Sequence, residues 1–312
     1  MSARLHDLEF VDLYLGLAYA DMKAQPGTNA TRVPIPEAYL AEVAAVRQRC
    51  AQMHESQQEP EFALLHDDTL YRVTVMVDLR AEPVYFLRRM AAQIRAIERL
   101  AMPASLKEFL MEPNSQGLTL FCGDMASGKT SSAASLLSAR LQAHGGLALA
   151  IEDPPETQLD GLHGSGRCIQ VPASRRHGHY REQLRRAMRT GVSTLLIGEI
   201  RCEDTASEAI RQSINGLTVI STIHAKNGVD ALTRLVTFAN GSVPDAAGVL
   251  AQGLRAVIHQ TIERVPTGGV RMRFVGLTLD GEDAAAIRTK IRTGQIASLQ
   301  QEFENQARRT IW

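Results

Sequence analysis

The sequence has few cysteines, few lysines and no long hydrophobic run. Its four cysteines stand far apart in a chain of 312 residues, and none forms a C-x-x-C pair. This spacing argues against a structural zinc site and favours a reducing compartment. No stretch approaches the roughly 18 apolar residues that a membrane-spanning helix needs. The first apolar stretch contains Asp7, Glu9 and Asp12, which a secretory signal peptide would not carry. We therefore expect a cytoplasmic protein without a transmembrane segment.

Net charge is also absent, because 34 Lys and Arg residues balance 34 Asp and Glu residues. No overall field favours nucleic acid or anionic lipid. Only five basic residues are lysines, against 29 arginines, so a lysine at a motif position is less often accidental. A chain of this length forms one large or two medium domains with a full core.

The first hundred residues predict a small α+β domain. Residues 36–55 begin with Pro36 and show helical spacing, with an apolar stripe made by Leu40, Val43, Ala44 and Val46. Strand-like runs follow at 62–65, 70–77 and 84–87, the first two joined across Asp67 and Asp68. A boundary at Met102-Pro103 gives a predicted N-terminal domain of residues 1–102.

The pattern changes after this boundary to alternating strand-like and helical runs. The strand-like runs cover residues 117–122, 147–152, 193–198 and 217–223. Such alternation is typical of a parallel sheet with crossover helices. From residue 227 the pattern is mainly helical, interrupted by a predicted hairpin over 256–279 around Pro266-Thr267-Gly268-Gly269. We predict an α/β domain over residues 103–312 that ends in helices.

The strongest motif lies at residues 123–130, which read Gly-Asp-Met-Ala-Ser-Gly-Lys-Thr and fit G-x-x-x-x-G-K-[ST]. In such a P-loop a buried strand delivers the loop, backbone N–H groups surround the phosphates, and the next helix points its positive end at them. Lys129 would reach the β- and γ-phosphates, and Thr130 would hold Mg²⁺. The other reading is a strand-to-helix turn without function. The expected nucleotide-binding residues are Gly123, Asp124, Met125, Ala126, Ser127, Gly128, Lys129, Thr130 and Ser131.

Three further segments follow the later strand-like runs, where an open α/β sheet binds its ligands. They are residues 150–156 (Ala-Ile-Glu-Asp-Pro-Pro-Glu), 195–201 (Leu-Leu-Ile-Gly-Glu-Ile-Arg) and 220–225 (Ile-Ser-Thr-Ile-His-Ala). Alone, an acidic cluster is usually a solvated turn and a histidine usually a hydrogen-bonding group at a strand end. In this order behind a P-loop, they predict one phosphate site.

This order of motifs resembles the secretion or traffic ATPases that drive type IV pili, type II secretion and type IV secretion. The segments match that family's Walker A motif, Asp box, Walker B motif and His box. The resemblance implies a RecA-like domain preceded by a PAS-like domain, with ATP and Mg²⁺ as ligands. It also implies a homo-hexameric ring that works at the inner membrane with a platform protein and a pilus or secretion apparatus. The short chain and the missing tetracysteine module look more like pilus retraction and type IVB-secretion or conjugation ATPases.

The resemblance also suggests residue roles. Glu156 stands at the Asp-box position of the general base, and Glu199 would organise Mg²⁺, although sequence leaves open which carboxylate acts as base. His224 would sense the γ-phosphate. Arg72 and Arg88 match positions that reach a neighbouring subunit's nucleotide, and a surface salt bridge is the alternative for each. The catalytic set is thus Glu156, Glu199, Lys129, His224, Arg72 and Arg88, with Thr130 and Glu199 as the metal-binding pair.

Three departures from the family pattern concern the turnover rate. Asp124-Met125-Ala126 replaces the usual Pro-Thr-Gly, Leu217 stands where many members have a first histidine, and Cys202 replaces an aspartate. None removes a group that binds phosphate or Mg²⁺. They keep open a second hypothesis, a nucleotide-binding regulator that has lost catalysis.

The densest basic stretch runs from Arg175 to Arg189 and includes His177-x-His179. We interpret it as a helix whose arginines pair across an interface or face the nucleotide, rather than as a nucleic-acid or metal site. A RecA-type nucleic-acid motor is a third hypothesis, which the Asp box and the zero net charge disfavour.

Overall fold

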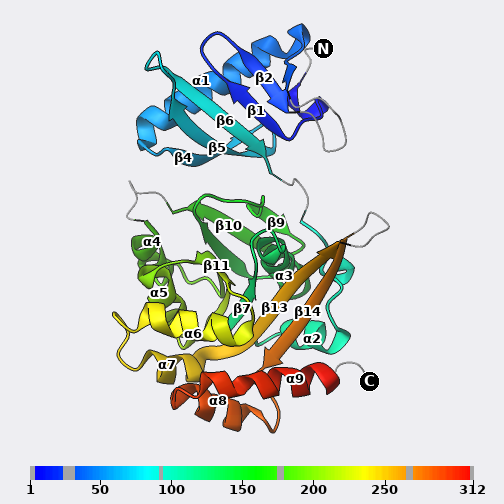
Figure 1. Ribbon diagram of the computed structural model, residues 1–312, viewed down its shortest axis with the longest axis vertical. Helices are drawn as coiled ribbons and strands as arrows, with labels where there is room; N and C mark the ends of the chain where they lie inside the picture. Colours follow the sequence, from blue (N-terminus) through cyan, green and yellow to red (C-terminus); the bar gives the residue numbers. More distant parts are fainter. Residues whose placement is uncertain (1–3, 24–31, 91–93, 174–178, 265–269, 310–312) are drawn as a thin grey trace. The chain divides into compact units, whose positions relative to one another are not determined.

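The computed structural model describes residues 4–23, 32–90, 94–173, 179–264 and 270–309, and the chain divides into two compact units (Figure 1). The first unit comprises residues 1–93 together with 153–158 and 172–179. The second comprises residues 94–152, 159–171 and 180–312. Within the described ranges, no helix combines the length and the apolar character that crossing a membrane requires.

The first unit is a six-stranded sheet with one long helix, α1 (Leu40–Gln57), after a short 3₁₀ turn at Glu37–Tyr39. The strand order is β3-β2-β1-β6-β5-β4, and each neighbouring pair is antiparallel. The strands are β1 (Asp12–Leu15), β2 (Ala20–Lys23), β3 (Val33–Pro34), β4 (Glu61–His66), β5 (Thr69–Val77) and β6 (Pro83–Arg89). The predicted helix and the three predicted strands are confirmed, whereas β1 to β3 were not predicted.

The core of this unit corrects the predicted helix stripe. Val43, Val46 and Cys50 are the buried residues of α1, while Leu40 is 45% exposed and Ala44 is exposed. Leu40 is the first residue of the helix, and Ala44 lies about 100° around the helix axis from Val43. The side chains of residues 43, 46 and 50 form the buried face of the helix. The predicted apolar stripe was therefore wrong for two of its four residues.

The second unit contains an eight-stranded sheet in the order β14-β13-β7-β12-β11-β8-β10-β9. Its middle is parallel throughout, since β13, β7, β12, β11 and β8 pair parallel with their neighbours in that series. This confirms the predicted α/β fold with a mainly parallel sheet. These five strands are β7 (Gly117–Gly123), β8 (Leu147–Glu152), β11 (Thr194–Ile200), β12 (Thr218–His224) and β13 (Leu254–Arg264).

Antiparallel hairpins complete the sheet. β9 (Gly161–His163) and β10 (Gly166–Pro172) were not predicted. β14 (Val270–Thr278) pairs with β13, which confirms the predicted hairpin and joins it to the main sheet. The predicted turn residues Pro266-Thr267-Gly268-Gly269 lie outside the described residues.

Helices connect and cover these strands. α3 packs against one face together with α2, and their apolar residues share one core cluster with β7, β8, β11, β12 and β13. The second unit also has short 3₁₀ turns at Ile97–Arg99 and Ile296–Leu299. Its helices are α2 (Ala104–Leu110), α3 (Lys129–His144), α4 (His179–Ala187), α5 (Glu203–Ser213), α6 (Gly228–Ala239), α7 (Ala246–Gly253), α8 (Ala284–Arg292) and α9 (Gln300–Arg309).

Arg140 of α3 fixes the end of α2. Its guanidinium is buried and donates to the carbonyl oxygens of Leu110 (2.6 Å), Glu112 (2.9 Å) and Pro113 (3.1 Å). These carbonyls follow the last turn of a helix and would otherwise lack partners. Burial, with the nearby charge of Arg255, lowers the pKa of Arg140 to about 10. Arg140 therefore ties the C-terminal half of α3 to the end of α2.

Candidate functional site

The predicted P-loop occupies the turn between β7 and α3. β7 is buried at every position and ends at Gly123, and α3 begins at Lys129. Gly128 precedes the helix with φ of 87°, a conformation that suits glycine. The tip residues Asp124, Met125 and Ala126 are exposed, whereas Ser127 and Lys129 are buried. This is the strand-loop-helix context that an anion site at a helix N-terminus requires.

Lys129, His224 and Glu199 form one connected chain at this loop. The Lys129 Nζ atom donates to the Asp124 carbonyl oxygen at 2.7 Å and lies 3.2 Å from His224 Nδ1. On the other side of the ring, His224 Nε2 lies 3.0 Å from Glu199 Oε1. An ammonium has no acceptor, so Nδ1 must accept from Lys129 and the Nε2–H must donate to Glu199. A neutral imidazole thus links the lysine to the carboxylate.

Sheet register brings these three residues together. β12 pairs parallel with β7 so that His224 lies opposite Gly123, the first residue of the P-loop. β11 pairs parallel with β12, and its register shifts between Ile197 and Ile200, the stretch that contains Glu199. The carboxyl ends of parallel strands meet at one edge of the sheet. The roles assigned to the three residues remain predictions.

Glu152 is a residue that the sequence analysis did not select. It ends β8, is 2% exposed, and accepts a hydrogen bond of 2.5 Å from Gln170 Nε2. A Cβ at Gly198 would lie 2.9 Å from Glu152 Cγ and 3.2 Å from the Tyr180 hydroxyl oxygen, so glycine permits this packing. The available sequence signal was an acidic residue directly after a buried apolar run.

Gln260 of β13 is the second residue that was missed. Its side chain is fully buried, and its Nε2 donates to the Ser127 carbonyl oxygen at 2.6 Å. No hydrogen-bond partner is present for Gln260 Oε1 or for Ser127 Oγ among the described residues. Gln260 therefore holds the P-loop backbone from the neighbouring strand. The sequence alone does not show that β13 lies beside β7, so it gives no sign of this contact.

The P-loop tip contains one strained residue. Ala126 has φ of 57°, in the left-handed region that costs a non-glycine residue about 1 kcal/mol. It stands within the Asp124-Met125-Ala126 departure, where the family pattern usually ends in glycine. An alanine therefore adopts here a backbone conformation that suits glycine.

The residues expected to hold Mg²⁺ have suitable chemistry. Thr130 is the second residue of α3 and is partly exposed, and the Glu199 side chain is 31% exposed. A hydroxyl and a carboxylate with access to water suit Mg²⁺, which keeps several waters and takes phosphate oxygens. In the part of the chain that the structure describes, the one metal-compatible group of three side chains is Glu42, His66 and Asp67 in the first unit.

Arg72 and Arg88 lie opposite each other on β5 and β6 of the first unit. Two like charges in this position repel, and carboxylates compensate both. Arg72 contacts Glu61 at 3.1 Å and Glu156 at 3.4 Å. Arg88 contacts Asp12 at 2.8 Å, and these bonds raise the pKa of the Arg88 guanidinium. The predicted base and a predicted arginine finger are therefore in contact, and the finger role remains a prediction.

The basic stretch is described only in part, because Arg175, Arg176 and His177 lie outside the described residues. Beyond them, Arg186 pairs with Glu182 within α4 at 3.1 Å. Arg181 lies 3.7 Å from Asp204. Cys202 is an exposed free thiol at the start of α5, whereas Cys50, Cys122 and Cys168 are buried. Burial raises the pKa of each buried thiol to about 12.

Known proteins share both sequence and fold with this chain. The type IV pilus ATPase PilU of Pseudomonas aeruginosa is 27% identical over 216 residues, which cover 68% of this chain and 54% of PilU. The matching part of the chain spans between 38% and 54% of the length of PilU and two other curated relatives. Two crystal structures share the fold. The pilus retraction motor PilT with bound ADP has a TM-score of 0.78 and 22% identity, covering 96% of this chain and 87% of PilT. The Legionella pneumophila ATPase DotB has a TM-score of 0.72 and 17% identity, covering 95% of this chain and 85% of DotB.

The match to a protein family covers most of the second unit and the end of the first. Residues 80–294 match the family described as type II/IV secretion system protein. This range contains the P-loop, the Asp box, Glu199 and His224, and it confirms the resemblance indicated by the motifs. The chain belongs to the type II/IV secretion system protein family.

Proposed function

We propose that this chain is an ATP-hydrolysing motor subunit that powers type IV pilus dynamics or type II or type IV secretion. The observation that carries the proposal is the chain of contacts from Lys129 through His224 to Glu199 at the mouth of the P-loop. These three groups are a cation for phosphate, a neutral hydrogen-bonding ring and a carboxylate. Phosphoryl transfer to water needs such groups, because it depends on charge neutralisation and on an oriented nucleophile.

Binding of ATP would rearrange this chain of contacts. The Lys129 ammonium would exchange the Asp124 carbonyl and His224 Nδ1 for phosphate oxygens, since charged acceptors bind it more strongly than neutral ones. Nδ1 of His224 would then be released. Bound Mg²⁺, held by Thr130 and by Glu199 through water, would neutralise charge on the phosphates. His224 would thereby report the occupancy of the site to Glu199.

Two carboxylates are candidates for activating water. Glu156 contacts Arg72 in the same unit, so movement of that arginine would change how the carboxylate is held. Glu199 is the other candidate, through its contact with His224. We favour Glu156 as base and Glu199 as organiser of Mg²⁺, following the family resemblance.

The assembly that we propose is a homo-hexameric ring on the cytoplasmic side of the inner membrane, with a platform protein as partner. Arg72 and Arg88 would act on the nucleotide of a neighbouring subunit, where they would add positive charge when subunits close. The similarity to PilU, a type IV pilus ATPase, and to PilT, a pilus retraction motor, supports work on a pilus, and the ring and the platform protein are proposed from the family resemblance. The division into a domain of residues 1–102 and a domain of residues 103–312 stays our prediction, and the first compact unit runs from residue 1 to residue 93 before the second begins.

Steady-state ATP hydrolysis by the purified full chain tests the proposal. We expect Mg²⁺-dependent turnover that Lys129→Ala and Glu199→Gln each reduce at least tenfold. Lys107→Ala is the matched control, because its ammonium donates to the Glu98 carbonyl oxygen at 3.3 Å and Lys107 lies on α2, outside the P-loop. Absence of turnover in the wild type would indicate a nucleotide-binding regulator. Turnover that single-stranded DNA stimulates severalfold would indicate a nucleic-acid motor.

A further inference from the structure

The outer edge of β14 carries backbone groups that point away from the sheet. β14 is the last strand in the sheet order, and its pairing with β13 runs without a break from Val270 to Thr278. In an antiparallel pair, alternate residues direct their N–H and C=O groups to the partner strand and away from it. Thr278 directs both groups outward, because both bond to the Gln306 side chain. By this alternation Gly276 and Phe274 also direct theirs outward.

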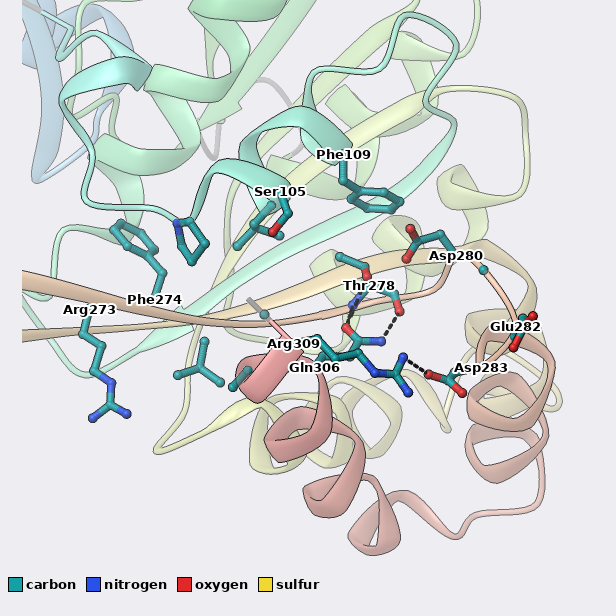
Figure 2. Close-up of a pocket in the computed structure, with 16 residues that line it drawn as sticks. Ser105, Phe109, Arg273, Phe274, Thr278, Asp280, Glu282, Asp283, Gln306 and Arg309 are labelled. Atoms are coloured by element: carbon teal, nitrogen blue, oxygen red, sulfur yellow. Dashed lines mark hydrogen bonds and ion pairs between the residues drawn. The ribbon is translucent and has the colours of Figure 1, made fainter. Parts of the chain in front are cut away.

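Gln306 acts at this edge as the first residue of a neighbouring strand would. Its Oε1 accepts from the Thr278 N–H at 2.8 Å, and its Nε2 donates to the Thr278 carbonyl at 3.0 Å (Figure 2). A side-chain amide offers the same donor and acceptor as a peptide group. The backbone N–H and carbonyl of Thr278 therefore both have hydrogen-bond partners, which the side-chain amide of Gln306 supplies. Across the described ranges, no strand continues that pairing at Gly276 and Phe274.

A pocket of about 450 Å³ lies beside these two residues, between α2 and α9 with β14 as its floor (Figure 2). Its apolar wall consists of Leu106, Phe109 and Phe274. At Gly276 the floor carries no side chain, and an added Cβ would lie 3.1 Å from a Leu106 methyl carbon, so Leu106 packs closely against the strand there. Gly276 is half-buried and Phe274 is 6% exposed. The volume falls within the range of sites that bind ligands through apolar anchors.

One end of the pocket is acidic. Asp280, Glu282 and Asp283 line it, and Asp283 pairs with Arg309 at 2.6 Å. Asp280 and Glu282 are exposed, and neither makes an ion pair within the described part of the chain. Figure 2 shows Arg273 at the opposite end of the pocket, away from these carboxylates. Two carboxylates are thus available to a cation.

We propose that this groove receives an extended segment of a partner protein, which pairs with Gly276 and Phe274 as an added strand. An apolar side chain of the segment fills the pocket beside Leu106 and Phe109, and a lysine or arginine lies near Asp280 and Glu282. Main-chain hydrogen bonds give affinity in such strand addition, and pockets for alternate side chains give specificity. The free edge with its peptide-like neighbour at Gln306 identifies the occupant as a polypeptide rather than a small molecule. The proposal does not depend on the nucleotide site.

Residue-resolved hydrogen exchange of the full chain tests it, with an end-blocked eight-residue peptide of alternating leucine and lysine as probe. Bound peptide should slow exchange of the Gly276 and Phe274 amides at least tenfold. It should leave Val275 and Leu277 unchanged, because their amides already face β13. Two peptides serve as controls. One has glutamate for lysine and should bind at least tenfold more weakly. The other has N-methylated alternate residues, cannot donate to the edge and should not protect it.

Two variants test the site itself, and a third serves as their control. Ser105→Trp fills the groove from an exposed position on α2, and Asp280→Lys with Glu282→Lys reverses the acidic end. Each should weaken peptide binding at least tenfold. Glu108→Lys is the matched control, since Glu108 is exposed on the same helix and does not line the pocket. A circular dichroism spectrum checks folding of each variant.

Several results would overturn the proposal. One is the absence of protection by the lysine peptide, and another is equal binding of the N-methylated peptide. Binding that Ser105→Trp leaves unchanged would place the peptide elsewhere. Protection of Gly276 and Phe274 without any peptide, rising with protein concentration, would assign the groove to a second copy of this chain. ATP turnover is not used as a readout, so the result is separate from that for the proposed motor function.

Discussion

The Lys129 ammonium and the His224 ring are in direct contact, with Nζ 3.2 Å from Nδ1. The same ring donates to Glu199, so occupancy of the phosphate site by a ligand would change the surroundings of a carboxylate two strands away from the loop. Glu199 and His224 come from neighbouring parallel strands. The contact is thus a consequence of the sheet rather than of a flexible loop.

Replacement of His224 by glutamine should separate nucleotide binding from turnover. We expect Lys129 and the loop amides to bind ADP with an affinity within about threefold of the wild type. The loss of the link to Glu199 should reduce kcat about tenfold or more, which corresponds to roughly 1.4 kcal/mol in the barrier. Titration calorimetry gives the affinity, and a phosphate-release assay gives kcat. An unchanged kcat would show that His224 is only a hydrogen-bonding group at the end of a strand.

Gln260→Leu should weaken nucleotide binding through the P-loop backbone. The variant keeps the side-chain volume but removes the bond to the Ser127 carbonyl, and an unmet buried carbonyl costs about 1–3 kcal/mol. We expect Kd for Mg–ADP to rise about fivefold or more. Gln212→Leu is the matched control, because Gln212 is also buried, with its Oε1 lacking a partner among the described residues, but lies on α5. Equal effects of the two changes on Kd would remove Gln260 from the site.

Ala126→Gly should stabilise the second unit. Ala126 adopts a positive φ, and glycine removes a strain of about 1 kcal/mol at some cost in unfolded-state entropy. We expect a gain of about 0.5 kcal/mol in the free energy of unfolding, measured by urea denaturation. Ala139→Gly in the interior of α3 should show the opposite sign, with a loss of about 1 kcal/mol. A loss in both variants would contradict the account of the loop.

Arg140→Met should destabilise the second unit by about 3 kcal/mol or more. The change leaves the carbonyls of Leu110, Glu112 and Pro113 without their donor, and each buried unsatisfied group carries a desolvation cost. Arg186→Ala, which breaks an exposed pair with Glu182, should cost less than about 0.5 kcal/mol. Urea denaturation, monitored by far-ultraviolet circular dichroism, compares the free energies of unfolding of the two variants. Similar small losses would mean that Arg140 is not required to hold α2.

His259 should make the second unit less stable at mildly acid pH. Burial lowers the pKa of His259, with Arg273 acting in the same direction and Asp124 opposing it. The unfolded chain therefore binds a proton at a higher pH than the folded chain, so the free energy of unfolding falls as pH falls through the ordinary histidine range. We expect His259→Gln to show a smaller decrease in melting temperature between pH 7 and pH 5 than the wild type. An identical decrease would contradict the prediction.

The sequence predicts the parallel sheet and the P-loop well, because local signals determine both. β7 is an apolar run interrupted by Thr119, and the glycine and lysine pattern directly after it is typical of a P-loop. The short strands β1 to β3 and β9 were missed because each has only two to four residues, too few for a periodicity. The stripe on α1 was misjudged at Leu40 and Ala44 because helical spacing alone does not reveal where the sheet begins to cover the helix.

The missed site residues have a different cause. Gln260 contacts Ser127 across 133 residues of sequence, and the order of strands in the sheet decides that contact. Glu152 was hidden beside Glu156 in the same acidic segment, and only burial distinguishes the two: Glu152 is 2% exposed, whereas the Glu156 side chain is 43% exposed. The sequence motif identifies the P-loop, whereas the order of strands in the sheet determines which side chains contact it.

Calorimetric titration of the full chain with Mg²⁺ and a non-hydrolysable ATP analogue tests the central claim most directly. The account predicts saturable binding of one nucleotide per chain in the micromolar range, weakened at least tenfold in Lys129→Ala and unaffected in Lys107→Ala. No binding by the wild type, or equal binding by Lys129→Ala, would contradict it.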